Sequence, residues 1–330
     1  MATTMQVDDA LLKKSRAEAY RSQVKVGNKL QPALCMASLL ALASFFATPA
    51  GVWCIVSALG FCSGFAAPEY VRMNPFRSFC IASVLTACWS ITTFVPFAMY
   101  YDKLYRSCGS SGHCQPKKAH DTTGLARREV REAVVALFMA AMLSSAVVVS
   151  HLTVKFDRMY TDVAEWGWPW FMASLVVYFL WIDCWAYFGH RALHLSFLYK
   201  SYHKLHHAYK QPTAFVALAI HPVDMLLLQG GVYVGLFVFP LHVGCIAINL
   251  LYIHYFNVVD HSGIYAESWL PWQPSSLYHD DHHQFFHINY GQSLTLWDRL
   301  AGTFLPDRPR ASHNALKAKA PATWSKGSIT

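Results

Sequence analysis

The sequence has 330 residues, of which 54% are hydrophobic and only 14% are charged, and its mean hydropathy is +0.25. Soluble domains usually carry about 25% charged residues. This composition argues against a disordered chain, a coiled coil and a secreted disulfide scaffold. It predicts an integral membrane protein that folds as one compact unit.

The net charge is +8, but the basic residues gather in the two tails and in one loop and do not form a stripe interleaved with aromatic residues. We interpret them as determinants of membrane topology and as contacts for anionic lipid headgroups, with no role in binding nucleic acid. The nine cysteines are an odd number, and six of them lie in or beside apolar runs. No disulfide framework is expected.

Charge and apolar runs divide the chain into regions. Residues 1–32 mix both signs of charge and are predicted to be a cytosolic or interfacial segment, and 307–330 to be a basic flexible tail. Residues 33–124 hold the first membrane segments and a basic loop; Pro49 to Gly51 interrupt their first apolar stretch, so it is either two short spans or one span plus an interfacial piece. Apolar runs expected in the membrane are 33–67, 78–101, 133–150, 170–189, 225–240 and 242–259.

Two loops give an orientation. The loop 102–132 carries seven Lys or Arg residues, whereas 154–169 carries only Lys155 and Arg158. Because cytoplasmic loops are enriched in Lys and Arg, we expect the first loop in the cytosol and the second on the far side. The run 170–189 then returns the chain to the cytosol just before His190.

Histidine carries most of the information about function. Eight of the 17 histidines fall in three short clusters, and His261 lies between the last two. Residues three and four positions apart share a face of a helix, so the side chains within each cluster are expected to point together. The clusters are His190 and His194; His203, His206 and His207; and His279, His282 and His283.

Three clusters with a repeated H-x-x-H-H spacing favour metal binding over a set of solvated interfacial histidines. The clusters contain no cysteine, so a Cys-type structural zinc site is not expected, and imidazole shells suit iron, zinc or copper. Eight or nine ligands exceed the needs of one tetrahedral zinc ion and predict two ions. Beside a membrane, and acting on a buried lipid, such a pair is best explained as iron that activates dioxygen.

These residues resemble the fatty acid hydroxylase/sterol desaturase superfamily, whose pattern is H-x3-H, H-x2-H-H and H-x2-H-H. Within it, the likeness is closest to the Δ7-sterol C5(6)-desaturases, also called lathosterol oxidases, and covers roughly residues 125–306. Further motifs that carry it are Tyr199-Lys200, Pro212-Thr213-x-Phe215, His221-Pro222-Val223-Asp224, Asn289-Tyr290-Gly291-Gln292 and Thr295-Leu296-Trp297-Asp298-Arg299-Leu300.

The resemblance implies an all-α polytopic membrane bundle with a cytosol-facing, histidine-rich di-metal site, in which residues 125–306 are the catalytic domain. It also implies two Fe ions, O2 as co-substrate, and electrons from NADH through cytochrome b5 reductase and cytochrome b5. The expected location is the endoplasmic reticulum membrane, and the expected substrate is a sterol or a sphingoid base. The sequence has no G-x-G-x-x-G nucleotide-binding motif, which agrees with an external electron donor.

Two alternatives remain open. The first is a hydroxylase of the same superfamily: a C4-methylsterol oxidase, a sphingoid-base C4-hydroxylase or a sterol hydroxylase. It is favoured by His261-Ser262-Gly263, where the desaturases read His-Asp-Gly, and by Tyr278, where they usually have another histidine. The second is a non-catalytic protein that binds or transports metal, which would distribute ionisable residues along its spans.

Other residues are weaker candidates. Asp183 lies two helical turns before His190, so we expect its carboxylate to accept the N–H of a ligand imidazole; Asp281 and Asp298 are similar candidates. His221 is either a ligand or a structural histidine in a turn. His242 is expected at the membrane interface and His287 in packing or in solvent. A small zinc site is a further candidate in a Gly/Ser-rich loop, at Cys108, His113, Cys114 and His120.

Overall fold

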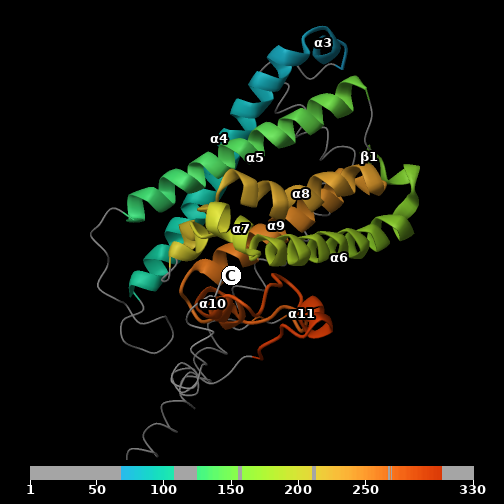
Figure 1. Ribbon diagram of the computed structural model, residues 1–330. Coiled ribbons are helices and arrows are strands. Elements are labelled where there is room, and N and C mark those ends of the chain that lie inside the picture. The colour runs from blue at the N-terminus through green and yellow to red at the C-terminus, as the bar shows by residue number, and fades with distance from the viewer. Residues whose placement is uncertain are drawn as a thin grey trace, which may run out of the picture.

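The computed structural model describes residues 68–107, 125–154, 158–209, 213–266, 268 and 270–306 (Figure 1). In these ranges the chain is helical, apart from one pair of two-residue strands. Four predictions lie outside the described residues: the cytosolic or interfacial segment 1–32, the membrane segments in 33–67, the tail 307–330 and the zinc site between Cys108 and His120.

Five long helices make up most of the described structure: α4 (Pro75–Ser107), α5 (Leu125–Thr153), α6 (Gly167–Leu193), α8 (Pro222–Val238) and α9 (Val243–His261). Four shorter helices accompany them: α3 (Pro68–Met73), α7 (Ser196–Leu198), α10 (Ser276–Phe285) and α11 (Leu296–Ala301). Single turns connect these elements: η1 (Val163–Glu165), the π-helical η2 (Tyr199–His203), η3 (His206–Ala208) and η4 (Ala214–Leu218).

Among the described helices, three are long and apolar enough to cross a membrane: residues 128–153 of α5, all of α6 and all of α9. Residues 75–88 of α4 and the whole of α8 are shorter apolar helices. Each of these five helices overlaps one of the expected apolar runs, because an uncharged run of about 20 residues satisfies its backbone hydrogen bonds only as a helix in lipid. The predicted class, an all-α membrane protein, is confirmed.

Small and large side chains alternate where α4 and α5 pack together. Ala98 of α4 and Ala133 of α5 are almost completely buried and let the two helices approach, while Phe94 and Leu137 fill the space beside them. The turn η4 and the end of α9 complete this core through Leu218 and Val259, among others. The core therefore lies directly behind the C-terminal end of α9.

Helices α6 and α8 pack closely because α8 presents glycines to large aromatic residues of α6. A β-carbon on Gly231 would lie 2.4 Å from Cγ of Trp185, and one on Gly235 would lie 2.7 Å from the Tyr178 ring. The indole of Trp181 donates a hydrogen bond of 2.8 Å to the Gly231 carbonyl. The glycines in this apolar run are thus explained by packing.

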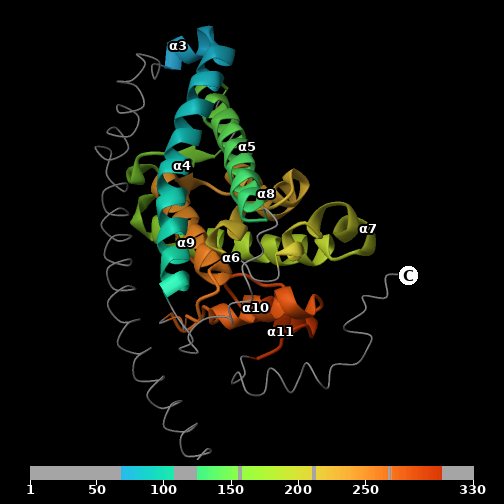
Figure 2. The same cartoon turned by 90° about the vertical axis from the view of Figure 1, so that its left-hand side faces the viewer.

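A short parallel strand pair fixes where α6 and α9 begin. β1 (Met159–Tyr160) pairs with β2 (Leu241–His242), and each strand shortly precedes one of the two helices. His242 caps α9 by accepting from the Gly244 amide, and its Nε2 donates to the Thr161 carbonyl at 2.9 Å. The His242 side chain is fully buried in the protein, and its expected depth at the membrane interface stays a prediction. Both helices run from this strand pair toward α7 and α10 (Figures 1 and 2).

Candidate metal centre

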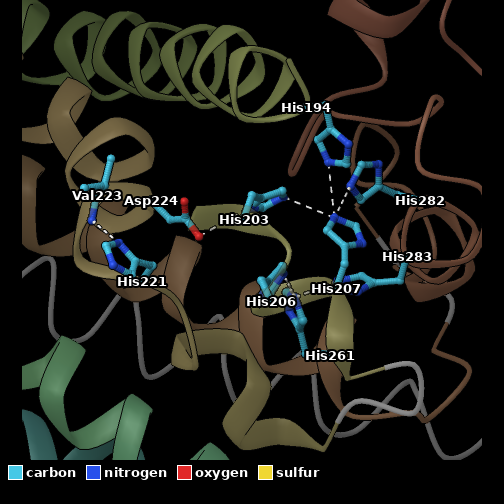
Figure 3. Close-up of polar contacts among 10 residues, drawn as sticks. All are labelled: His194, His203, His206, His207, His221, Val223, Asp224, His261, His282 and His283. Carbon is cyan, nitrogen blue, oxygen red and sulfur yellow. Dashed lines mark hydrogen bonds and ion pairs between the residues drawn. The ribbon is translucent and has the colours of Figure 1, made fainter. Parts of the chain in front are cut away.

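Nine imidazoles converge at the C-terminal ends of α6 and α9. They form two groups, and within each group the candidate ligand nitrogens all lie within 4.8 Å of one another. The five-histidine group consists of His190, His194, His203, His207 and His282. The four-histidine group consists of His206, His261, His279 and His283. Figure 3 shows seven of the nine, His190 and His279 being left out.

Each H-x-x-H-H motif contributes to both groups. On α10, His279 and His283 are one turn apart and belong to the four-histidine group, whereas His282 belongs to the other. His203 and His207 likewise belong together, to the five-histidine group, whereas His206 belongs to the four-histidine group. The expectation that each cluster points together is confirmed for the pairs four residues apart. It is wrong for the third member, because adjacent helical residues point about 100° apart.

The ring nitrogens face one another at short distances. Nε2 of His207 lies 3.2 Å from Nε2 of His194, 3.1 Å from that of His203 and 3.2 Å from that of His282. In the four-histidine group, Nε2 of His261 lies between 3.0 and 3.3 Å from its three neighbours. A neutral imidazole has a single N–H. If the Nδ1 atom carries that proton and donates it elsewhere, the facing Nε2 atoms have no proton with which to hydrogen-bond one another.

Backbone carbonyls do use those protons. Nδ1 of His190 lies 2.8 Å from the Tyr290 carbonyl, Nδ1 of His261 lies 2.7 Å from the Asn257 carbonyl, and Nδ1 of His282 lies 2.7 Å from the Ile288 carbonyl. Because a carbonyl oxygen only accepts, each of these Nδ1 atoms carries the proton. Each Nε2 therefore directs a lone pair inward, as in protein metal sites, and the donor set fits two cations.

For His203, the acceptor near Nδ1 is a carboxylate instead of a backbone carbonyl. Oδ2 of Asp224 lies 3.4 Å from Nδ1 of His203, and both side chains are completely buried. Asp224 stands in the first turn of α8, and its other oxygen has no hydrogen-bond partner in the described structure. The sequence analysis did not predict that Asp224 orients a candidate ligand. The signal was present in the motif His221-Pro222-Val223-Asp224, but nothing in the spacing connects Asp224 with His203.

The predicted role of Asp183 is wrong. Its carboxylate accepts from the Ser293 amide at 3.0 Å and from the Trp297 indole at 2.8 Å, and no histidine is among these partners. Its place in the fold explains the difference: the carboxylate faces the segment 293–297 and ties it to α6. Asp183 therefore supports the wall of the site from behind.

Asp298 holds the neighbouring loop, and the prediction that it accepts directly from a ligand imidazole is wrong. Its carboxylate accepts from the amides of Tyr290 and Gly291, and from the hydroxyls of Thr303 and Tyr278. Since the Tyr290 carbonyl accepts from His190, Asp298 positions a histidine through one intervening residue. Tyr278 turns toward this carboxylate. Asp281 is buried on α10, and its predicted role stays a prediction.

His221 lies apart from both groups, as Figure 3 shows. Its Nδ1 accepts from the Val223 amide at 3.1 Å, so the side chain caps the N-terminus of α8. Of its two predicted roles, the structure supports the structural one. His287 is exposed, which agrees with the expectation that it is not a ligand.

Burial keeps the imidazoles neutral. It lowers the pKa of His282 to about 3, and it holds the pKa of His194, His207 and His283 well below the usual value of 6.5. Repulsion between neighbouring imidazoles, once protonated, adds to the effect of burial. Neutral imidazole is the form that binds metal, so the site is ready to accept cations at neutral pH.

A small cavity of about 10 Å³ opens beside the four-histidine group. One face of α9 forms its first wall, through Ile253, Phe256, Asn257, Asp260 and His261. The opposite wall consists of His279, Gln292 and Ser293. The cavity thus combines apolar and polar side chains with two of the candidate ligands.

Comparison with known proteins places this site in a family context. Residues 175–303 match the fatty acid hydroxylase family. The chain is 37% identical over 153 residues to the lathosterol oxidase of Mus musculus, covering 45% of this chain and 51% of the mouse protein. It is 32% identical over 182 residues to the lathosterol oxidase of Homo sapiens, covering 54% and 60%.

A fungal relative gives the same result. The chain is 35% identical over 133 residues to the Delta(7)-sterol 5(6)-desaturase of Saccharomyces cerevisiae, covering 39% of this chain and 36% of the yeast protein. The chain thus spans about half the length of the mammalian relatives and less of the yeast one. No solved structure matches it. Residues 175–303 are therefore similar to the fatty acid hydroxylase family, and the chain is similar to lathosterol oxidases and Δ7-sterol 5(6)-desaturases.

Proposed function

We propose that this chain is a membrane-bound oxidoreductase that oxidises a lipid with O2 at a pair of iron ions. The most specific form of the proposal is introduction of the C5(6) double bond into a Δ7-sterol. The observation that carries it is the inward convergence of nine imidazoles, in two groups, at the end of apolar helices. The names of the similar proteins supply the substrate class.

The five-histidine group and the four-histidine group would hold one ion each. The chemistry that bound iron supplies is the reductive activation of O2, which zinc cannot support because it has no redox chemistry. In the balanced reaction, the lipid loses two hydrogens, and O2 with two added electrons and two protons becomes two waters. NADH, through cytochrome b5 reductase and cytochrome b5, is the proposed source of the electrons.

The side chains of this chain have three tasks in that reaction. The carbonyls of Tyr290, Asn257 and Ile288 hold the imidazole rings in one tautomer and one orientation. Burial of the histidines keeps bulk water away from a reaction that must break an unactivated C–H bond. The small cavity beside His261 and His279 marks the place where a substrate carbon would approach the four-histidine group.

Hydroxylation is the second candidate. It uses the same donor set but adds one oxygen atom to the substrate carbon, with a single water as the other product. The observation that favours it is Ser262 directly after His261: its hydroxyl donates to the Val259 carbonyl at 2.6 Å and so ends α9 without adding a carboxylate near the ligands.

We also propose a location. The basic loop between α4 and α5 supports a position of the histidine groups on the cytosolic side of the endoplasmic reticulum membrane, because α6 begins after the far-side loop 154–169 and the groups lie at its opposite, C-terminal end. Such an orientation gives a cytosolic electron donor access to the site.

Expression in a yeast strain that lacks sterol C5-desaturation tests the proposal, with His282→Ala as the variant and total lipids profiled by mass spectrometry. New Δ5,7-sterols with the wild-type chain alone are the expected result. Hydroxylated sterols or sphingoid bases would instead assign the chain to the hydroxylases. If the expressed, iron-loaded chain yields neither kind of product, the proposed substrate classes are overturned. Activity retained by His282→Ala would overturn the metal site.

A further inference from the structure

An exposed apolar stripe runs along α6 toward the five-histidine group. Met172, Val176, Leu180 and Phe188 are between 38% and 59% exposed, and because each step of four residues turns about 40° beyond a full turn, the row winds around the helix toward its C-terminal end. In a helix that is long and apolar enough to cross a membrane, such a stripe faces lipid.

The stripe does not stop where α6 stops. Leu195 is 63% exposed and Phe197 is 71% exposed, and both follow directly after His194. In Figure 2, α7 lies at the edge of the helical body, on the side away from α4. Two large apolar side chains therefore project from the segment that carries a candidate ligand, beyond the end of the apolar helix.

This segment is also where the histidines come closest to the surface. His194 is only partly buried, whereas the other eight candidate ligands are buried. The Tyr199 ring covers it, with ring centroids 5.5 Å apart, and the Phe286 ring lies on His207 at 4.9 Å. Tyr199 and Phe286 also contact each other, with centroids 6.1 Å apart. Two aromatic rings thus lie against the five-histidine group on this side.

The backbone at Phe286 is constrained to keep its ring there. Its φ is 68°, in the left-handed region that residues with a β-carbon rarely adopt. The conformation ends α10, where the Phe286 amide donates to the His282 carbonyl at 2.8 Å. The position of the ring is therefore linked to that of a candidate ligand.

Charge around the segment complements a lipid headgroup layer. Residues 184–223 contain no Asp or Glu, and three basic residues in this stretch, Arg191, Lys200 and Lys204, are exposed. Exposed apolar side chains with basic neighbours are typical of a segment that lies in the membrane interface.

We propose that residues 195–199 lie in the membrane interface and form the entrance through which a lipid passes from the bilayer to the five-histidine group. The occupant is a bilayer lipid, an elongated apolar molecule that slides along the α6 stripe. Tyr199 and Phe286 are positioning residues that line the inner end of the entrance. The use of this entrance by a substrate rests on the proposed lipid oxidation, but the contact with lipid does not.

Photo-crosslinking tests the contact directly. The full chain is reconstituted in phosphatidylcholine vesicles that contain a phosphatidylcholine with a diazirine in its acyl tail, irradiated, and digested with trypsin. Cleavage after Arg191 and Lys200 releases a peptide of residues 192–200, which should carry the lipid adduct. The peptide that begins at Leu300 is the control: this side chain is 73% exposed but lies on α11, which is not one of the apolar helices, and should not be labelled.

Substitution tests the use of the entrance. Phe197→Asp should raise KM for the lipid about tenfold, because a carboxylate is costly in apolar surroundings, while kcat and metal content stay the same. Leu300→Asp is the matched control and should leave KM unchanged. Should Phe197→Asp fail to accumulate, Phe197→Ala removes the apolar contact with less disturbance and should raise KM in the same direction.

Two results would overturn the inference. One is labelling of α6 without labelling of residues 192–200. The other is a cross-link between residues 192–200 and a second copy of the chain, which would make this face a protein interface. If the chain oxidises no lipid but residues 192–200 are labelled, the proposed function fails while the membrane contact holds.

Discussion

Asp224 and His203 form a buried pair in which the carboxylate lies 3.4 Å from Nδ1 of the imidazole. The two residues are 21 positions apart and come from α8 and from the turn η2. A buried carboxylate is costly without a compensating positive charge, and a cation bound by His203 would provide one. The pair thus connects the stability of α8 with occupancy of the five-histidine group.

Replacement of this acid should weaken metal binding. We expect Asp224→Asn to fold and to lower metal affinity about 10- to 100-fold, because orienting carboxylates have effects of this size. Metal content, measured by mass spectrometry after dialysis against a weak chelator, gives the readout. Asp162→Asn, at an exposed helix cap, is the control. Unchanged metal content in Asp224→Asn would contradict the role of the pair.

Ligand substitutions should divide the two groups. His261→Ala removes a ligand only from the four-histidine group and His282→Ala only from the five-histidine group, so each should reduce the bound metal from about two ions per chain toward one. His221→Ala should keep both ions, because His221 caps α8. The same loss from all three variants would mean that general unfolding, not loss of a ligand, removes the metal.

The contacts of Asp183 should matter for stability. Asp183→Asn retains one acceptor and loses a charge-assisted bond, so we expect the free energy of unfolding to fall by about 1–3 kcal/mol. Trp297→Phe removes only the indole donor and should cost less than Asp183→Ala, which removes the acceptors for both donors. Thermal unfolding in detergent at fixed metal load ranks the three variants. An Asp183→Ala variant as stable as the wild type would refute this role.

The metal-free protein should be sensitive to mild acid. The pKa of His282 is about 3 in the folded chain, whereas an unfolded histidine has a pKa of about 6.5. Between these values the unfolded chain binds more protons, so the free energy of unfolding falls as the pH falls, by about 1.4 kcal/mol per pH unit for each excess proton. Above about pH 6.5 this dependence disappears.

Melting temperatures of the chelated protein between pH 5 and pH 8 measure this effect. The melting temperature of His282→Asn should change less steeply with pH than that of the wild type, because this variant lacks one of the histidines that bind a proton in this range only in the unfolded chain. Bound metal should shift the loss to lower pH, since metal and protons compete for the same nitrogens. A melting temperature that stays constant from pH 8 to pH 5 would contradict the prediction.

Much of the fold could be predicted from local pattern. Apolar runs of about 20 residues predict membrane helices whatever their neighbours are, and α5, α6 and α9 follow that rule. The close packing of α6 and α8 could not be predicted in the same way. Gly231 and Gly235 are visible in the sequence, but that they face Trp185 and Tyr178 depends on which helices become neighbours.

The candidate site likewise has features that follow from local sequence pattern and features that depend on tertiary contacts. The sequence alone determined that histidines four residues apart, such as His279 and His283, share a face, because helical periodicity is a local property. It also determined the donor type and hence the range of metals.

Only the tertiary structure decided how the histidines combine. The neighbours His206 and His207 belong to different groups, as do His282 and His283, because adjacent side chains diverge and meet partners from other elements. It also decided which partner each acid contacts: Asp183 accepts from the Trp297 indole, and Asp224 contacts His203. Such contacts join residues far apart in the chain, and local spacing carries no information about them.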